Sequence, residues 1–227
     1  MKGRYRPISN FRIIILLTII FTAQSYSVEY YKNGTGKPVL FVIAGIHGDE
    51  RSSIEFTEEL KEYKPKKGTI IVIPQAYKEA VKKGIRAEYY DTDLNRVFFK
   101  EGKGKTPDIA KEIIDLIEKY QPNIILDLHE SWYNYDESKD FNLYMGNTLI
   151  FSEESSKRID ELILELIIEN NLTGIIWPMT GTLSREIPQS YNIAVLTVET
   201  SKKDSSDKRK EIYKNIFNKT LLYLKME

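Results

Sequence analysis

Short apolar runs alternate with longer segments of helical periodicity along most of the chain. Five runs predict buried strands, over residues 38–44, 69–74, 123–128, 141–145 and 193–198. Continuous apolar runs rich in β-branched residues are typical of strands covered on both faces. Four intervening segments keep apolar residues at helical spacing: 52–63, 107–120, 153–171 (expected to close near Gly174) and 207–224. The pattern predicts an α/β fold, with helices on both faces of a mostly parallel sheet.

Composition limits the classes of function. The chain has 227 residues, which is enough for one domain with a sizeable core. Its 33 Lys and Arg residues balance 33 Asp and Glu residues, so we expect no nucleic-acid partner, because such binders carry a basic excess. The absence of cysteine excludes disulfide and thiolate chemistry.

The N-terminus has the three parts of a secretory signal. A basic head (Lys2, Arg4, Arg6, Arg12) precedes the apolar run 13–21, and the small residues Ala23, Ser25 and Ser27 follow. This layout predicts a signal peptide over residues 1–27 and a catalytic domain over residues 28–227. The alternative is an uncleaved anchor, which would be the chain's only contact with a membrane. Both interpretations predict a secreted or extracytoplasmic domain.

The chain contains two histidines, and both follow predicted strands. His47 lies at the end of the run 38–44, with Glu50 three residues later, and His129 ends the run 123–128. Side chains at the carboxyl ends of parallel strands meet at one edge of a sheet. A catalytic zinc takes three protein ligands and keeps a fourth position for water, so His47, Glu50 and His129 are candidate zinc ligands. Taken singly, each motif is equally compatible with a polar loop or a structural histidine.

The segment Asp93-Leu94-Asn95-Arg96 suggests a substrate clamp. Arg96 and Asn95 are donors suited to a carboxylate on the substrate, and Asp93 could accept the spare N–H of a ligating histidine. The alternative is a turn with a surface salt bridge. Asp127 shares a strand face with His129, so it could support the site or be a buried structural carboxylate.

Two further residues are candidates for catalytic roles. Glu199 follows an apolar strand, where burial can raise the pKa of a carboxyl group and make it a general base. Arg86 could polarise the scissile carbonyl and stabilise the oxyanion. A solvated acid and a solvated loop arginine are the respective alternatives. Aromatic residues follow these motifs and could line a groove or pack on the surface: Tyr89, Tyr90, Trp132, Tyr133 and Tyr135. Residues 180–185 are expected to form a loop.

Taken in order, these motifs resemble the zinc carboxypeptidase superfamily, and in particular its succinylglutamate desuccinylase and aspartoacylase branch. The resemblance rests on Gly-Ile-His-Gly-Asp-Glu, Asp-Leu-Asn-Arg and Asp-Leu-His, and it extends from about Pro38 to Ser201. It implies an α/β/α sandwich around a mixed, mostly parallel, twisted sheet of eight strands. It also implies a role for each candidate residue: zinc ligation by His47, Glu50 and His129, general base for Glu199, carboxylate binding for Asn95 and Arg96, support of the first histidine for Asp93, and carbonyl polarisation for Arg86.

These roles predict a secreted zinc hydrolase that cleaves an amide bond next to a free carboxylate. A metallocarboxypeptidase acting on peptides fits best, and the predicted location makes cell-wall peptides attractive substrates. An N-acyl amino acid deacylase with the same machinery and a non-catalytic binding module on the same fold are the alternatives. A closed basic pocket would favour the deacylase, whereas an open groove would favour the peptidase.

Overall fold

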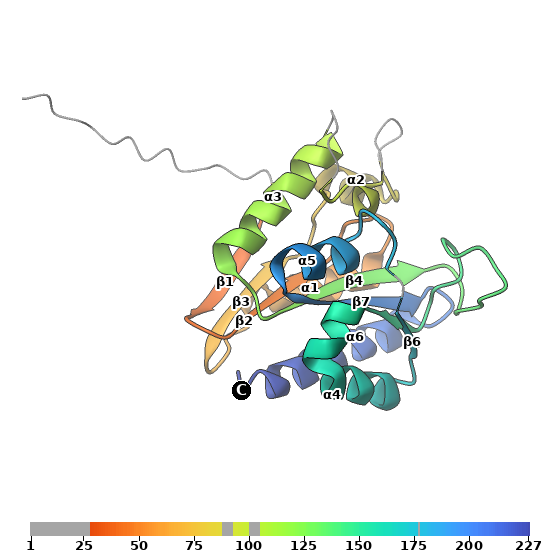
Figure 1. Cartoon of the computed structure of the whole chain (residues 1–227). Coiled ribbons are helices and arrows are strands. Elements are labelled where there is room, and N and C mark those ends of the chain that lie inside the picture. Colours follow the sequence, from red (N-terminus) through yellow and green to blue (C-terminus); the bar gives the residue numbers. More distant parts are fainter. Residues whose placement is uncertain (1–27, 88–92, 100–104, 177) are drawn as a thin grey trace, which may run out of the picture.

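A mixed seven-stranded sheet forms the centre of the molecule. The structure is a computed structural model that describes residues 28–87, 93–99, 105–176 and 178–227. The strands lie in the order β1-β3-β2-β4-β7-β5-β6 (Figure 1). Their bounds are β1 Tyr31–Thr35, β2 Val39–Ile43, β3 Gly68–Ile73, β4 Ile124–Ser131, β5 Thr148–Ile150, β6 Thr173–Ile175 and β7 Ala194–Ser201. The central strands β3, β2, β4 and β7 are parallel, whereas β1 and β5 pair antiparallel with β3 and β7. The described residues therefore form seven strands, one fewer than the resemblance implied.

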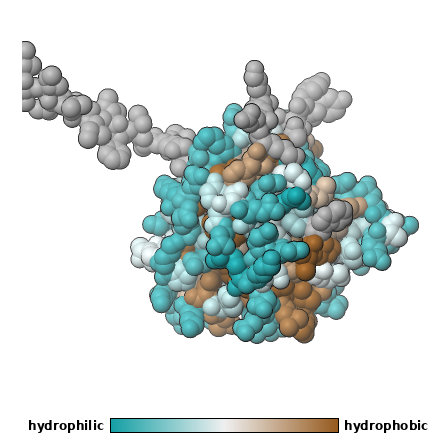
Figure 2. Space-filling view, viewed as in Figure 1, coloured by the Kyte–Doolittle hydropathy of each residue, from teal (hydrophilic) through white to brown (hydrophobic). Residues whose placement is uncertain are grey.

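Helices cover both faces of the sheet, as predicted. They are α1 Arg51–Glu59, continued by the 3-10 turn η1 Leu60–Glu62, then α2 Lys78–Lys83, the 3-10 turn η2 Leu94–Arg96, α3 Lys105–Tyr120, α4 Glu153–Asn170, α5 Leu183–Tyr191 and α6 Ser206–Tyr223. One apolar core joins the sheet to α1, α4 and α6, and a second joins its other face to α2, α3 and α5. Polar residues cover much of the surface in the view of Figure 2. The α/β/α sandwich is thus confirmed.

Several local expectations were wrong. Residues 141–145 form a turn rather than a strand, because this segment folds back on the end of β4: Ser131 Oγ donates to the Leu143 carbonyl at 2.8 Å. Helix α4 ends at Asn170, close to the expected bound, but the left-handed backbone of Asn171 stops it rather than Gly174, which lies inside β6. Part of the expected loop 180–185 belongs to α5. The short elements β1, β5, β6 and α2 were not predicted.

Two sequence-based expectations lie outside the described residues. These are the signal segment 1–27 and the aromatic pair Tyr89 and Tyr90. Within the described ranges, none of the helices is long and apolar enough to cross a membrane.

The strand register places the chemically active side chains side by side. In the parallel pair of β4 and β7, Asp127 lies opposite Thr197 and His129 lies opposite Glu199. In the pair of β2 and β4, Ile43 lies opposite Asp127, so the loop that leaves β2 emerges beside His129. Residues distant in sequence therefore meet at the carboxyl edge of the central strands.

Candidate metal centre and active site

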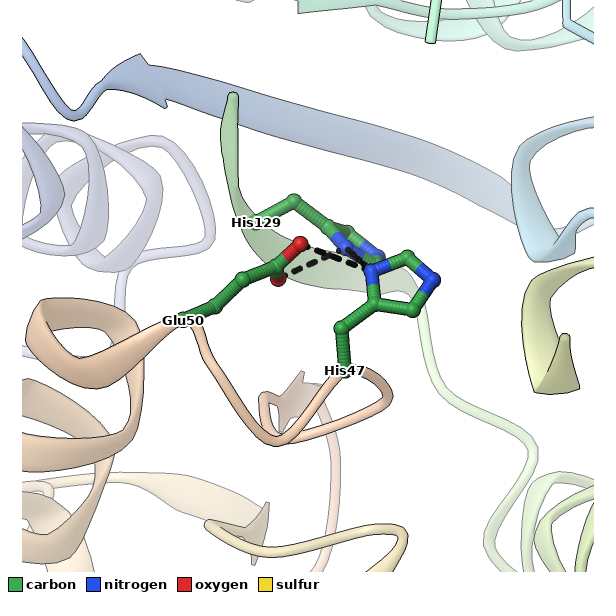
Figure 3. Close-up of side chains that lie close together, drawn as sticks. All are labelled: His47, Glu50 and His129. Atoms are coloured by element: carbon green, nitrogen blue, oxygen red, sulfur yellow. Dashed lines mark hydrogen bonds and ion pairs between the residues drawn. The ribbon is translucent and has the colours of Figure 1, made fainter. Parts of the chain in front are cut away.

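His47, Glu50 and His129 point toward one another at this edge (Figure 3). His47 Nδ1 lies 2.7 Å from Glu50 Oε1 and 3.2 Å from His129 Nδ1, and His129 Nδ1 lies 3.0 Å from Glu50 Oε2. Two ligands of a tetrahedral zinc ion, each about 2.1 Å from it, are separated by roughly 3.4 Å. All three side chains are buried. Their atoms are therefore spaced like the ligands of a single small cation.

A close approach between the loop at Gly48 and helix α2 positions the side chains of His47 and Glu50. The loop from β2 to α1 runs against helix α2, and Gly48 donates its N–H to the Ile85 carbonyl at 3.0 Å. A Cβ atom at Gly48 would lie 2.0 Å from the carbonyl carbon of Ala80. Only glycine permits this approach, which places His47 and Glu50 on either side of the contact.

A carboxylate lies behind each imidazole. His47 Nε2 is 2.9 Å from Asp93 Oδ1, and His129 Nε2 is 3.0 Å from Asp127 Oδ1, although the second pair lacks hydrogen-bond geometry. Asp127 also accepts a hydrogen bond from Thr197 Oγ1 at 3.0 Å. Carboxylates in this position fix the orientation of a ligating histidine, here with Nδ1 facing inward.

The charges of this cluster favour a bound cation. Burial alone would raise the pKa of Glu50, but the charges of the two imidazoles lower it, so the carboxylate is ionised. Against the effect of burial, the negative charges around them raise the pKa values of both histidines: Glu50 and Asp93 act on His47, and Asp127 and Glu50 act on His129. Glu50 Oε2 is buried, and its 3.0 Å contact with His129 Nδ1 lacks hydrogen-bond geometry, which is costly unless another species binds this oxygen. The donor set and this orphaned oxygen fit a divalent metal ion.

A cavity that is partly open to solvent adjoins the cluster. His47, Arg86, Asn95, Arg96 and Glu199 all line it. Glu199 is partly buried, and burial raises the pKa of its carboxyl group to about 7. A carboxyl group with such a pKa can both accept and return a proton near neutral pH. The structure thus brings together every residue predicted for the site.

The two arginines of the cavity are held in different ways. Arg86 Nη2 lies 2.9 Å from Asp93 Oδ2, and its Nη1 lies 3.9 Å from Glu50 Oε1. Arg96 donates to its neighbour's carbonyl at 2.7 Å and to Asn142 Oδ1 at 3.3 Å. Two guanidinium groups beside a carboxamide suit an anionic substrate group.

Three aromatic side chains near the site, Tyr191, Trp132 and Tyr133, are not among the residues that line the cavity. The Tyr191 hydroxyl donates to Glu118 on helix α3 at 2.6 Å, away from the cavity. Trp132 is 52% exposed beneath the Lys202 ammonium, and Tyr133 stacks on Tyr144. Cavity-lining residues that the sequence analysis did not assign include Glu130, Ser131, Asn142, Met145, Met179, Thr182 and Ser184. Glu130 and Thr182 carried a signal in the sequence: Glu130 directly follows His129, and Thr182 lies in the segment 180–185 that was expected to form a loop.

Comparisons with known proteins agree with this fold. Residues 36–139 match the catalytic domain model of the succinylglutamate desuccinylase/aspartoacylase family. None of the proteins with curated descriptions matches the sequence. The apo structure of the cell shape determinant Csd4 from Helicobacter pylori is 21% identical with a TM-score of 0.76, covering 88% of this chain and 55% of that one. The chain thus spans about half the length of Csd4.

Two other solved structures are similar. An aspartoacylase family protein from Mesorhizobium loti is 19% identical, with a TM-score of 0.65 and coverage of 87% of this chain and 61% of that one. The ectoine utilization protein EutE from Ruegeria pomeroyi is 18% identical, with a TM-score of 0.67 and coverage of 86% and 59%. At these identities the likeness establishes the fold.

The fold and the arrangement of the site define an α/β/α protein with a His-Glu-His group able to hold a metal. Within that class, the resemblance predicted from the motifs is confirmed: the chain resembles the succinylglutamate desuccinylase/aspartoacylase branch.

Proposed function

We propose that the protein is an extracytoplasmic, zinc-dependent hydrolase that cleaves an amide bond next to a free carboxylate, and specifically a metallocarboxypeptidase. One observation carries this proposal: a buried His-Glu-His group opens onto a cavity that also contains Glu199 and two arginines. Two imidazoles and a carboxylate are a ligand set typical of catalytic zinc in peptidases.

The chain's own residues supply the rest of the chemistry. A zinc ion held by His47, Glu50 and His129 would provide an acidified water and polarise the scissile carbonyl. Glu199 takes the proton from the attacking water and returns it to the leaving amine. Arg86 stabilises the developing oxyanion. Asn95 and Arg96 hold the substrate's terminal carboxylate and so fix the position of the scissile bond.

Peptides of the cell wall are the proposed substrates. The cavity is partly open to solvent, which suits the end of a longer chain. Csd4 is described as a D,L-carboxypeptidase, and structures of it hold a tripeptide or mDAP. The three-part N-terminus supports export, with or without cleavage after residue 27.

A deacylase of N-acyl amino acids is the second candidate. The match of residues 36–139 to a desuccinylase and aspartoacylase domain favours it, and so do the two arginines of the cavity. Both activities use the same metal, base and carboxylate clamp. A binding module without catalysis is disfavoured, because a binder has no need of a proton acceptor beside the metal ligands.

The decisive experiment is a mass-spectrometric digest of purified wall peptides with the metal-loaded protein, with and without a chelator. We expect chelator-sensitive loss of a C-terminal residue. Unchanged peptide masses, from protein shown to contain zinc, would overturn the peptidase proposal. The same protein would then be tested on N-succinyl and N-acetyl amino acids, and turnover there would establish the deacylase.

A further inference from the structure

The N-terminus of helix α1 is capped by a residue of strand β4. Glu50 occupies the capping position of this helix, but its side chain makes no capping hydrogen bond. Glu130 Oε1, from β4, instead accepts the N–H groups of Ser52 at 2.5 Å and Ser53 at 3.0 Å. These are the second and third residues of the helix, whose N–H groups a capping side chain normally binds.

Because Glu130 caps the helix, the Glu50 carboxylate does not have to cap it and can face the two imidazoles instead. A carboxylate at the capping position is attracted to the free N–H groups of its own helix. The Glu50 carboxylate turns away from them and lies between the two imidazoles, at 2.7 and 3.0 Å from their Nδ1 atoms. Its main chain stays anchored in the helix, because its carbonyl accepts from Ser53 Oγ at 2.8 Å.

We propose that Glu130 is a positioning residue that caps helix α1 in place of Glu50 and thereby frees the Glu50 carboxylate to bind the metal. The proposal rests on the metal site proposed above. It gives a role to a buried charge that the hydrolytic mechanism does not use. Burial of a carboxyl group is expensive unless its oxygen atoms are all paired, and those of Glu130 are.

Helix α6 holds Glu130 in place from behind. Arg209 donates to the second carboxylate oxygen, Glu130 Oε2. Ser206, one turn earlier, lies 2.9 Å from Ser52 by their Oγ atoms, and Tyr213 donates to the His129 carbonyl at 2.6 Å. Helix α6 therefore contacts Glu130, helix α1 and the main chain of His129 at once. The strand alternation explains why: Glu130 faces α1 and α6, whereas Asp127 and His129 face the opposite side of the sheet.

The test compares the zinc affinity and the stability of Glu130→Ala and Arg209→Met. Zinc affinity is measured by competition with a chromophoric chelator, and Co²⁺ spectra report the ligand geometry. Stability is measured by urea unfolding in excess chelator. We expect Glu130→Ala to lower zinc affinity by about 10- to 100-fold and to change the Co²⁺ spectrum, because Glu50 turns back to cap its helix. We expect both variants to be less stable than wild type. Arg209→Met nevertheless retains its zinc affinity, because Glu130 Oε1 still accepts the N–H groups of Ser52 and Ser53.

If Glu130→Ala does not fold, the double variant Glu130→Gln with Arg209→Met tests whether Glu130 acts through its capping oxygen. It keeps an acceptor oxygen at the cap and removes both charges, so we expect wild-type zinc affinity. A tenfold loss there, or unchanged affinity in Glu130→Ala, would overturn the inference. Wild-type protein that binds no zinc would instead refute the metal site itself, so the two failures are distinguishable.

Discussion

Substitution of Gly48 by alanine tests how the metal-binding loop is positioned. The added Cβ atom would lie 2.0 Å from the carbonyl carbon of Ala80, 2.1 Å from its oxygen and 2.3 Å from the nitrogen of Val81. Carbon atoms in ordinary contact are about 3.5 Å apart, so the loop and helix α2 must separate by roughly 1.5 Å. All three atoms belong to the main chain, and therefore no side-chain rotation relieves the collision.

Two measurable effects follow from this displacement. Overpacking against a rigid backbone costs about 2–3 kcal/mol of unfolding free energy. A shift of this size also moves His47 and Glu50, which flank Gly48, relative to His129 on strand β4. We expect zinc affinity to fall about tenfold or more, because a site displaced by an ångström loses its ligand geometry.

Urea unfolding in chelator measures the first effect, and chelator competition for zinc measures the second. Gly174→Ala is the matched control, because its Cβ would lie 2.6 Å from Ile167 Cδ1, the end of a flexible side chain that can rotate away. We expect the control to change stability by about 0.5 kcal/mol or less. If Gly48→Ala unfolds at the urea concentration of wild type and binds zinc equally well, the close approach of loop and helix does not exist.

Three further predictions concern proton transfer and the metal. Glu199→Gln should retain zinc and lose about 10²- to 10⁴-fold in turnover, and unchanged turnover would exclude Glu199 as the base. The raised pKa values of His47 and His129 mean that protons compete with the metal already above pH 6.5, the ordinary histidine pKa, so zinc affinity should fall as the pH is lowered, and a titration calorimeter should detect proton release. Burial raises the pKa of Glu199 from 4.5 to about 7, so the folded state binds its proton more tightly than the unfolded chain. In metal-free protein this stabilisation is complete below about pH 4 and is lost as the pH rises through about 7, by at most about 3 kcal/mol. Urea unfolding of Glu199→Gln should lack that loss, and equal slopes in both proteins would contradict the assignment.

The central elements of the fold could be predicted from local pattern. Strands β2, β3, β4 and β7 are buried on both faces, so each contains a run of apolar residues. In long amphipathic helices such as α3, the apolar residues recur at clear helical spacing. The peripheral strands β5 and β6 have three residues each and α2 has six, which is too short for a period to show. The apolar run 141–145 has strand-like composition but forms a turn, because hydrogen bonds with the end of β4 hold it there.

Part of the candidate site could likewise be predicted from the sequence, and part depends on the tertiary structure. Residue type and strand-end position were enough to select His47, Glu50, His129 and Glu199, since parallel strands deliver their carboxyl ends to one edge. The direction of each imidazole, the cap that Glu130 provides and the closeness of Gly48 to helix α2 arise only from contacts between segments distant in the chain. Local sequence specifies which face of a strand a residue occupies, but the register between β4 and β7 decides that His129 and Glu199 are neighbours. That register depends on how the whole apolar core packs, and no short segment encodes it.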